Sequence, residues 1–439
     1  MATPRSFSAS GPLRGTITVP GDKSISHRAL MLSALAVGES KIEGLLEGED
    51  VLATAAAMRA MGAQIEKRGE RWHVYGVGVG GLLQPITALD MGNSGTSTRL
   101  MMGLVASHPI TATFIGDASL SGRPMGRVID PLSLMGADIT ASPGGRLPLM
   151  VRGMCPAISL EYRLPVASAQ VKSAILLAGL NTPGITRVIE PVPTRDHSER
   201  MLAGFGAELT VETGANGVRT ISIRGEAELR PQSIVVPGDP SSAAFLVVAA
   251  LLVPGSAITV ANVGVNQTRN GIFRVLSVMG ADIRFENERT VGGEPVADLV
   301  VRHSDLSAVE PDPSIVPCMI DEFPIAFVAA ALAHGRSTFR GLEELRVKES
   351  DRIAVMAKAL TSIGARVEEL PDGLIVEGTG GELLAGGATI ATHLDHRIAM
   401  SMVVAGQVSR AAVTIDDIAP IATSYPVFFD QIRSLQGAA

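Results

Sequence analysis

The sequence predicts an α/β fold of two similar domains, each with buried helices inside and sheets outside. Three features support this prediction: a short joint that occurs twice, a helix-ending glycine that recurs along the chain, and a series of helices that are apolar nearly all round. At 439 residues and 46% hydrophobic content, the chain is too long for one ordinary core and has enough apolar side chains for two.

The joint is Val-Pro-Gly-Asp, found at 19–22 and again at 236–239, with a Leu-Arg pair shortly before each copy. The first copy is followed by Lys23, Ser24 and Arg28, whereas the second is followed by proline, two serines and apolar residues. A duplicated fold with polar chemistry kept on one copy predicts a site built between unequal halves.

Six Gly-Ala pairs mark the ends of amphipathic stretches. Glycine accepts a left-handed conformation without steric cost, so it stops a helix directly after the last periodic residue. Strand-like alternation follows the stops, as at 63–67 and 72–75, which predicts a hairpin in each unit. The stops are Met61-Gly62-Ala63, Met135-Gly136-Ala137, Phe205-Gly206-Ala207, Met279-Gly280-Ala281, Ile363-Gly364-Ala365 and Gln436-Gly437-Ala438.

A second series of six helices lacks a polar face, and such helices are buried. They are expected at 29–36, 100–106, 171–180, 243–253, 325–333 and 398–408. The repeating unit is therefore one buried helix, one amphipathic helix and short strands, with three units in each half. Aromatic residues make up only 3% of the chain and glycine is frequent, so the helices are expected to pack closely through small side chains.

The domain boundaries follow from the last unit, whose amphipathic helix has no hairpin after it. We expect the strand Gly15–Val19 to complete that unit, which places the N-terminus in the second domain. The prediction is a first domain at 21–235 and a second formed by 1–20 with 236–439, with crossovers near 20–22 and 230–239.

Polar residues stand at the start of every buried helix, where side-chain oxygens can cap free backbone N–H groups. The starts are 23–28, 93–99, 168–172, 239–242, 321–322 and 395–397. Capping alone is the favoured interpretation for 239–242. It does not explain Lys23, Arg28 and Arg397, because the helix dipole disfavours cations at a helix start. If the helices of each half run parallel, their starts converge on one face, and the two faces would form an anion-binding cleft.

Further cations stand in loops, namely Arg123, Arg195, Lys348 and Arg352. The last two are four residues apart, so on a helix they would share a face, with Glu349 beside them. A solvent-exposed helix start without a function would show the same spacing of charged residues. Asn93-Ser94-Gly95-Thr96 suits close backbone approach to a ligand, although a short glycine turn is weak evidence by itself.

Composition narrows the partners. A net charge of −7 disfavours nucleic acid, which needs a basic face. Cys155 and Cys318 lack metal-ligand spacing, so neither a disulfide framework nor a metal site is predicted, and a cytoplasmic protein is expected. Met1–Gly11 has no apolar run and predicts no secretory signal; a truncated transit peptide is the alternative. The most apolar stretch, 243–253, is short of the roughly 20 residues that cross a bilayer, so no membrane is expected as a partner.

Taken together, these segments resemble the 5-enolpyruvylshikimate-3-phosphate synthases, the 3-phosphoshikimate 1-carboxyvinyltransferases of aromatic amino-acid biosynthesis. The resemblance runs from Gly15 to the C-terminus, and Gly92–Thr96 and Arg346–Arg352 are its most specific motifs. Ser168-Ala169-Gln170 and Thr194-Arg195-Asp196-His197 look like the class II branch. The resemblance implies the enolpyruvyl transferase fold, in which each of two domains has three βαβαββ units.

The resemblance also implies the reaction and the residues that carry it. The enolpyruvyl group of phosphoenolpyruvate would pass to the 5-hydroxyl of shikimate-3-phosphate, releasing phosphate. We expect no metal, because the cations already supply the charge, and also no cofactor and a monomeric protein. Asp321 would take the hydroxyl proton, and Glu349 with Lys23 would handle the methylene proton. Shikimate-3-phosphate would contact Lys23, Ser24, Arg28, Ser168, Ala169, Gln170, Arg195, Asp321 and Lys348. Phosphoenolpyruvate would contact Lys23, Gly95, Arg123, Gln170, Arg352 and Arg397.

Three positions depart from the common family pattern. Ala169 replaces a second serine, Glu344 stands where others have asparagine, and Thr423 stands where many have a lysine. In this family glyphosate competes with phosphoenolpyruvate, and tolerant class II members commonly have alanine at the position of Gly95. The glycine therefore predicts more sensitivity to glyphosate than the class II resemblance suggests.

Two other functions compete with this interpretation. The related enolpyruvyl transferase that acts on UDP-N-acetylglucosamine usually has a cysteine in the loop that corresponds to 116–127, and asparagine where Ser24 stands; this chain has neither. A non-catalytic anion-binding scaffold would keep the fold and lose the chemistry. The presence of Asp321, Glu349 and Lys23 argues against it, and a phosphate-release assay separates the two.

Overall fold

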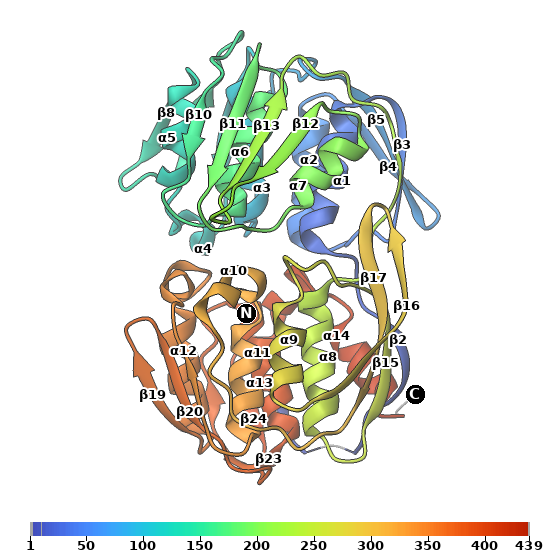
Figure 1. Ribbon diagram of the computed structural model, residues 1–439, viewed down its shortest axis with the longest axis vertical. Helices are drawn as coiled ribbons and strands as arrows, with labels where there is room; N and C mark the ends of the chain where they lie inside the picture. The colour runs from blue at the N-terminus through green and yellow to red at the C-terminus, as the bar shows by residue number, and fades with distance from the viewer. Residues whose placement is uncertain (1–2, 10, 438–439) are drawn as a thin grey trace. The chain divides into compact units, whose positions relative to one another are not determined.

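The computed structural model describes residues 3–9 and 11–437 (Figure 1). By their contacts these residues form two compact units, one at 21–236 and one that combines the N-terminal segment to Pro20 with the chain from Pro237 onward. Each unit has three buried helices surrounded by small sheets, as the sequence predicts.

In the unit 21–236, each of the three sheets has four strands. The first strand of each sheet pairs in parallel with the second, and the remaining pairs are antiparallel. In spatial order, the sheets are β14 (Ser233–Val235), β3 (Val37–Glu43), β5 (Arg71–Val77) and β4 (Gln64–Arg68); β6 (Leu89–Asp90), β7 (Thr111–Ile115), β9 (Arg146–Arg152) and β8 (Asp138–Ser142); and β10 (Glu161–Arg163), β11 (Ile185–Glu190), β13 (Arg219–Arg224) and β12 (Leu209–Thr213).

The helices of this unit alternate between two kinds. The buried ones are α1 (Lys23–Leu35), α3 (Gly95–Ala106) and α6 (Ala169–Gly179), and the half-exposed ones are α2 (Glu49–Ala60), α5 (Gly126–Leu134) and α7 (His197–Gly204). One further turn, α4 (Ala118–Ser121), lies in the loop that precedes Arg123.

The other unit repeats this plan with more irregular sheets. Its sheets are β2 (Arg14–Thr18), β15 (Ala257–Gly264), β17 (Glu294–Arg302) and β16 (Asp282–Val291); β18 (Arg336–Phe339), β20 (Gly373–Glu377) and β19 (Arg366–Leu370); β1 (Arg5–Phe7), β24 (Val413–Ile415) and β22 (Thr389–Ile390); and the pair β21 (Leu384–Gly386) and β23 (Ser409–Ala411).

Its buried helices are α8 (Pro240–Leu252), α11 (Phe323–Leu332) and α13 (His396–Gln407), in which every residue is buried. Its half-exposed helices are α9 (Gly271–Val278), α12 (Arg352–Ser362) and α14 (Phe428–Leu435). Short turns are α10 (Val316–Met319) and the 3-10 segments η1 (Pro313–Ile315), η2 (Glu343–Val347) and η3 (Ala419–Thr423).

The predicted glycine stops are confirmed in all six repeats. Each of the six half-exposed helices ends shortly before one of these glycines. The glycine itself has a φ between 72° and 104°, the left-handed region that residues with a Cβ rarely adopt. Ala438, in the last of these motifs, lies outside the described residues.

The predicted role of the N-terminal strand is wrong. The strand at Arg14–Thr18, β2, pairs in parallel with β15 and so completes the first repeat of its unit, not the last. The last repeat is completed by β1, whose residues Arg5–Phe7 pair antiparallel with β24. The sequence did not predict β1, because a strand of only three residues is too short to show an alternating pattern.

Small side chains do allow close helix packing, as the composition predicts. At Gly103 of α3, a Cβ atom would lie 2.2 Å from the carbonyl oxygen of Ala174 in α6, so the two backbones touch. This contact fixes the spacing of two helices whose N-terminal ends both carry predicted site residues.

Among the described residues, no single helix is long and apolar enough to cross a membrane. One bent pair, Pro313–Met319 with Phe323–Leu332, meets the requirement by length and composition only, with 118° between its parts.

Candidate active site

In the unit 21–236, the starts of the three buried helices converge, as predicted. Gln170 at the start of α6 donates to the hydroxyl of Thr96 and accepts from Arg99 Nη1, both at 3.0 Å, and these two residues lie near the N-terminal end of α3. His27 of α1 lies 3.1 Å from the hydroxyl of Ser97 in α3. The N-terminal parts of the three helices therefore lie close together, and their dipoles favour an anion there.

Lys23, the first residue of α1, is held by a carboxylate. Its Nζ lies 3.1 Å from Oδ2 of Asp50 in the first turn of α2, and both side chains are largely buried. Asp22 caps α1 by accepting from the backbone N–H of Ile25. The unfavourable cation at this helix start is thus partly balanced by Asp50, a residue that sequence inspection did not select.

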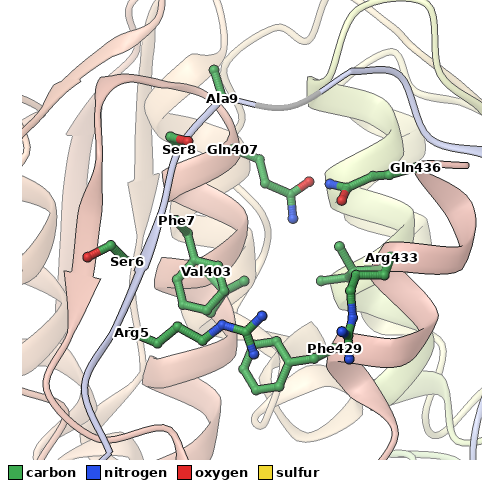
Figure 2. Close-up of a pocket in the computed structure, with 11 residues that line it drawn as sticks. Arg5, Ser6, Phe7, Ser8, Ala9, Val403, Gln407, Phe429, Arg433 and Gln436 are labelled. Carbon is green, nitrogen blue, oxygen red and sulfur yellow. The ribbon is translucent and has the colours of Figure 1, made fainter. Parts of the chain in front are cut away.

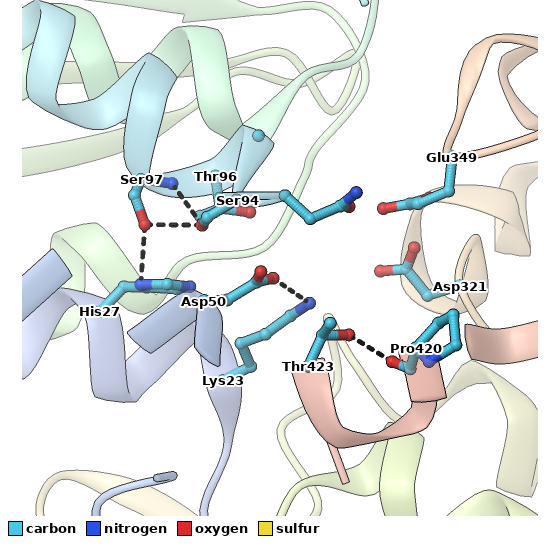
Figure 3. A network of polar contacts seen from close by, with 12 residues as sticks. Lys23, His27, Asp50, Ser94, Thr96, Ser97, Asp321, Glu349, Pro420 and Thr423 are labelled. Atoms are coloured by element: carbon cyan, nitrogen blue, oxygen red, sulfur yellow. Dashed lines mark hydrogen bonds and ion pairs between the residues drawn. The ribbon is translucent and has the colours of Figure 1, made fainter. Parts of the chain in front are cut away.

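A hydroxyl network joins α1, α2 and α3 near this lysine, and Figure 3 shows the part of it formed by His27, Ser97 and Ser94. His27 Nδ1 lies 2.7 Å from Thr54 Oγ1, which lies 2.6 Å from Ser97 Oγ, and Ser97 is 2.6 Å from Ser94. Burial lowers the pKa of His27 well below its usual value, and the neighbouring Lys23 lowers it further. The ring is therefore neutral and serves as a hydrogen-bonding group within the network.

Arg28 lies in α1 a little more than one turn after Lys23, and it is 5% exposed. Its guanidinium donates to the hydroxyls of Ser198 and Ser173, at 2.7 and 2.8 Å, and to the carbonyl oxygen of Ser24 at 2.9 Å. These bonds join α1 to α6 and α7. The cation is held rigidly, which is the arrangement that a fixed anion contact requires.

Arg123 is oriented by the Asn93 turn. Its Nη2 donates to Asn93 Oδ1 at 2.6 Å and to Ser119 Oγ at 3.1 Å, and Asn93 in turn donates to Asp117 at 2.7 Å. A Cβ atom built on Gly95 would lie 3.1 Å from Arg123 Nη1, so the glycine leaves room for this guanidinium. The predicted importance of the Asn-Ser-Gly-Thr turn thus has a structural reason.

The segment that carries Arg195 is tied to α6 by a buried ion cluster. Lys172 Nζ lies 3.0 Å from Glu190 at the end of β11 and 2.7 Å from Glu199 in α7, and all three side chains are buried. Arg195 itself is half-buried and lies between these two glutamates in the sequence. Ser168 caps α6 by accepting from Val171 N, and Ala169 accepts from Ser173.

In the other unit, Arg352 is the centre of the candidate site. Its side chain is 1% exposed and is surrounded by three carboxylates: Asp395 at 2.8 Å, Glu349 at 2.6 Å and Asp321 at 3.4 Å. Burial opposes the charge, but these carboxylates raise the pKa of Arg352 above its usual range. The guanidinium is permanently charged and holds both predicted acid–base carboxylates in position.

The helix starts of this unit converge in the same way. Arg397 at the start of α13 donates to the carbonyl oxygen of Asp321 at 3.1 Å and lies 3.8 Å from Glu322. Glu322 also accepts from the hydroxyl of Ser241 at the start of α8. Arg269 donates to Asp239 at 3.2 Å and to Ser241 at 2.9 Å. Asp239 caps α8, so the predicted capping role is confirmed, and it is also part of an ion cluster.

One prediction about local structure is wrong in this unit. Lys348 and Arg352 do not share a helix face, because Asp351 caps α12 and the helix begins only at Arg352, whereas Lys348 directly follows η2. The residues before α11 do not cap it with a side chain, because the Glu322 carboxylate is taken by Ser241 and the arginines. Burial lowers the pKa of Lys348, although Asp321 and Glu349 counteract this.

The structure shows where the three residues that depart from the family pattern lie and what two of them contact. Ala169 is the first residue of α6, where its backbone carbonyl supports Ser173. Glu344 lies half-buried in η2. Thr423 is half-buried and donates to the carbonyl oxygen of Pro420 at 2.7 Å, as Figure 3 shows. Among the described residues, no group of three or more His, Cys, Asp or Glu side chains is arranged to hold a metal ion.

Comparison with known proteins decides the family. The model of EPSP synthase (3-phosphoshikimate 1-carboxyvinyltransferase) matches residues 7–432. The chain belongs to the EPSP synthase family. It is an enzyme of this family, and the transferase that acts on UDP-N-acetylglucosamine is not favoured.

Curated relatives extend over the whole chain. The 3-phosphoshikimate 1-carboxyvinyltransferase of Sphingopyxis alaskensis is 72% identical and covers 99% of both chains. That of Novosphingobium aromaticivorans is 70% identical and covers 98% of this chain and 99% of its own. The solved EPSP synthase of Acinetobacter baumannii is 44% identical, covers 98% of both chains and superposes with a TM-score of 0.86. The predicted fold class is thereby confirmed.

Several residues that support the site were not predicted from the sequence. Asp50, Thr54 and Ser198 stand on amphipathic helices, where a polar residue ordinarily faces solvent. Lys172 did carry a signal, since it is the one charged residue inside the apolar stretch of α6. A buried lysine requires carboxylate partners, but the sequence does not say which ones.

Proposed function

We propose that this chain transfers the enolpyruvyl group of phosphoenolpyruvate to the 5-hydroxyl of shikimate-3-phosphate, with release of phosphate. Both substrates are anions, and both units hold cations rigidly at converging helix starts. The observation that carries the proposal is the group around Arg352, in which Asp321 and Glu349 flank one buried guanidinium. Family membership supports the same reaction.

The two substrates have different sets of proposed contacts, and some residues belong to both sets. Lys23, Gly95, Arg123, Gln170, Arg352 and Arg397 contact phosphoenolpyruvate, and arginine forks suit its carboxylate and phosphate. Lys23, Ser24, Arg28, Ser168, Ala169, Gln170, Arg195, Asp321 and Lys348 contact shikimate-3-phosphate. The bonds that orient Arg28, Arg123 and Gln170 within the protein support these assignments, because they hold the side chains in place before a substrate arrives.

The reaction consists of an addition step and an elimination step, and both require proton transfer. In the addition step, the 5-hydroxyl oxygen bonds to the central carbon of phosphoenolpyruvate, Asp321 takes the hydroxyl proton, and a proton goes to the methylene carbon. In the elimination step, the new methyl group loses a proton, the C=C bond forms again, and the C–O bond to phosphate breaks; the phosphate leaves with the proton that Asp321 had taken. Glu349 with Lys23 handles the carbon-bound proton, and the cations stabilise the charge that develops on phosphate.

All proposed residues come from one chain, which supports action as a monomer. We place the enzyme in the cytoplasm, where the thiols of Cys155 and Cys318 would stay reduced. The division into two domains, with crossovers near 20–22 and 230–239, is part of the same proposal.

The test is the variant Asp321→Asn, which keeps the size of the side chain and removes the proton acceptor. In a phosphate-release assay with both substrates, we expect kcat to fall by about 100-fold or more. Binding of shikimate-3-phosphate, measured by calorimetry, should change by less than about threefold, because the amide keeps the shape of the site.

The matched control is Asp305→Asn, which makes the same change at an exposed aspartate of the same unit. It should leave both measurements unchanged. Normal turnover in Asp321→Asn would remove Asp321 from its proposed role, whereas failure of the unmodified chain to release phosphate would overturn the reaction itself.

A further inference from the structure

A pocket separate from the candidate active site lies in the unit that contains the N-terminus, between β1, α13 and α14 (Figure 2). Its volume is about 260 Å³. This is below the roughly 300–1,000 Å³ of sites for drug-sized molecules, so it suits a small ligand. The pocket contains none of the proposed active-site residues. Gln407, which lines it, ends the helix α13, whereas Arg397 stands near its start, roughly 15 Å away along the axis.

The walls of the pocket are fixed by packing. A Cβ atom on Gly406 would lie 2.9 Å from both Cβ and the carbonyl oxygen of Phe7, so β1 rests directly on α13. The Phe7 ring stacks on Phe429 of α14, with 5.5 Å between the ring centroids and 7° between the planes. The pocket is therefore formed before any ligand binds.

A cation stands at its edge. The Arg5 guanidinium lies 4.6 Å from the centroid of the Phe429 ring and 5.4 Å from that of Phe7, and these contacts orient it. Within residues 3–9 and 11–437, Arg5 has no carboxylate within ion-pair distance, whereas Arg433 is 2.5 Å from Asp430. The pocket is net positive, and Arg5 is available for the carboxylate of a ligand.

A buried acceptor faces the same space. Gln407 is 5% exposed, and its Oε1 has no hydrogen-bond partner among the described residues. Figure 2 shows the carboxamides of Gln407 and Gln436 directed toward each other across the pocket. A buried oxygen without a hydrogen-bond partner destabilises the protein, so an N–H donor from a ligand would be bound favourably there. The remaining wall, at Val403 and Ile432, is apolar.

We propose that this pocket binds a small α-amino acid with an apolar side chain. The carboxylate would pair with Arg5, the ammonium would donate to Gln407 Oε1, and the side chain would cover Val403 and Ile432. One cation, one unsatisfied acceptor and an apolar wall match the three parts of such a zwitterion. A simple anion would leave Gln407 unsatisfied.

The test is calorimetric titration of the full chain with L-leucine, compared with two analogues. Leucinamide lacks the carboxylate, and 4-methylpentanoate lacks the ammonium. We expect one molecule of L-leucine to bind per chain and each analogue to bind at least about tenfold more weakly, because each loses one charge-assisted hydrogen bond. Equal binding of the three compounds would overturn the ligand class, and no heat of binding at about 10 mM L-leucine would overturn the site.

Two variants locate the binding. Arg5→Gln and Gln407→Leu should each weaken L-leucine binding about tenfold or more, because each removes one of the proposed polar contacts. Arg410→Gln is the matched control, because Arg410 is an exposed arginine outside the pocket that pairs with Glu382. Unchanged binding in both pocket variants, with thermal unfolding like that of the unmodified chain, would exclude this location.

Discussion

Replacing Gly103 by alanine tests the packing that holds the candidate site together. The added Cβ would lie 2.2 Å from the carbonyl oxygen of Ala174 and 2.8 Å from its Cα, whereas ordinary contacts begin at 3.4 Å. The obstacle is the backbone of α6, which cannot rotate away as a side chain can. Helices α3 and α6 must therefore separate by about 1 Å, a strain at the upper end of the 1–3 kcal/mol that overpacking usually costs.

We expect Gly103→Ala to lower the free energy of unfolding of the unit 21–236 by about 3 kcal/mol. For a unit of this size, that corresponds to a fall in Tm of roughly 6–12 °C in differential scanning calorimetry. Activity should fall as well, because the 3.0 Å bonds from Gln170 to Thr96 and Arg99 join the starts of these same helices.

The matched control is Gly204→Ala. Gly204 is also helical, as the last residue of α7, and a Cβ there would meet no atom within 4 Å. This change should leave Tm unchanged or raise it slightly, because alanine favours the helix by up to about 1 kcal/mol. If Gly103→Ala lowers Tm no more than Gly204→Ala does, the close packing of α3 on α6 does not stabilise the unit as described.

Two further predictions concern pH and inhibition. Burial lowers the pKa of His27, so as the pH falls the imidazole is protonated in the unfolded chain before it is protonated in the folded one, and the folded protein should lose stability below about pH 6.5. In urea unfolding, His27→Gln should reduce the loss of stability between pH 7.5 and 5.5. An equal loss in both proteins would contradict this prediction. We also expect Gly95→Ala to raise the inhibition constant of glyphosate more than the KM for phosphoenolpyruvate, since glyphosate is longer. A Cβ there would lie 3.1 Å from Arg123 Nη1, so some loss of substrate affinity is expected; equal losses for both ligands, or strong tolerance in the unmodified enzyme, would refute the size argument.

Much of the candidate site could be predicted because its residues stand at recognisable helix starts. Ser94, Ser168 and Asp395 cap their helices as polar residues there should. The site roles themselves remain predictions, because they rest on family resemblance and on cations placed where a helix dipole disfavours them. The supporting residues could not be predicted, since Asp50 and Glu199 become partners of lysines only when separate helices pack.

The errors concern interactions between distant segments or competition for one side chain. Glu322 precedes α11 but does not cap it, because its carboxylate pairs with Ser241 and Arg269 once α8 and α11 lie together. Spacing alone placed Lys348 and Arg352 on one helix, whereas Asp351 caps α12 three residues after Lys348 and sets the start of the helix. Local spacing cannot rank partners that come from elsewhere in the chain.

The sequence by itself determined the elements that depend on local physics. Six left-handed glycines ended six helices, and six stretches without a polar face became buried helices, because backbone sterics and hydrophobic burial act within a few residues. Only the tertiary structure decided that β2 pairs with β15 while β1 pairs with β24. Strand pairing satisfies backbone groups of either segment equally well, so the choice belongs to the packing of the whole unit.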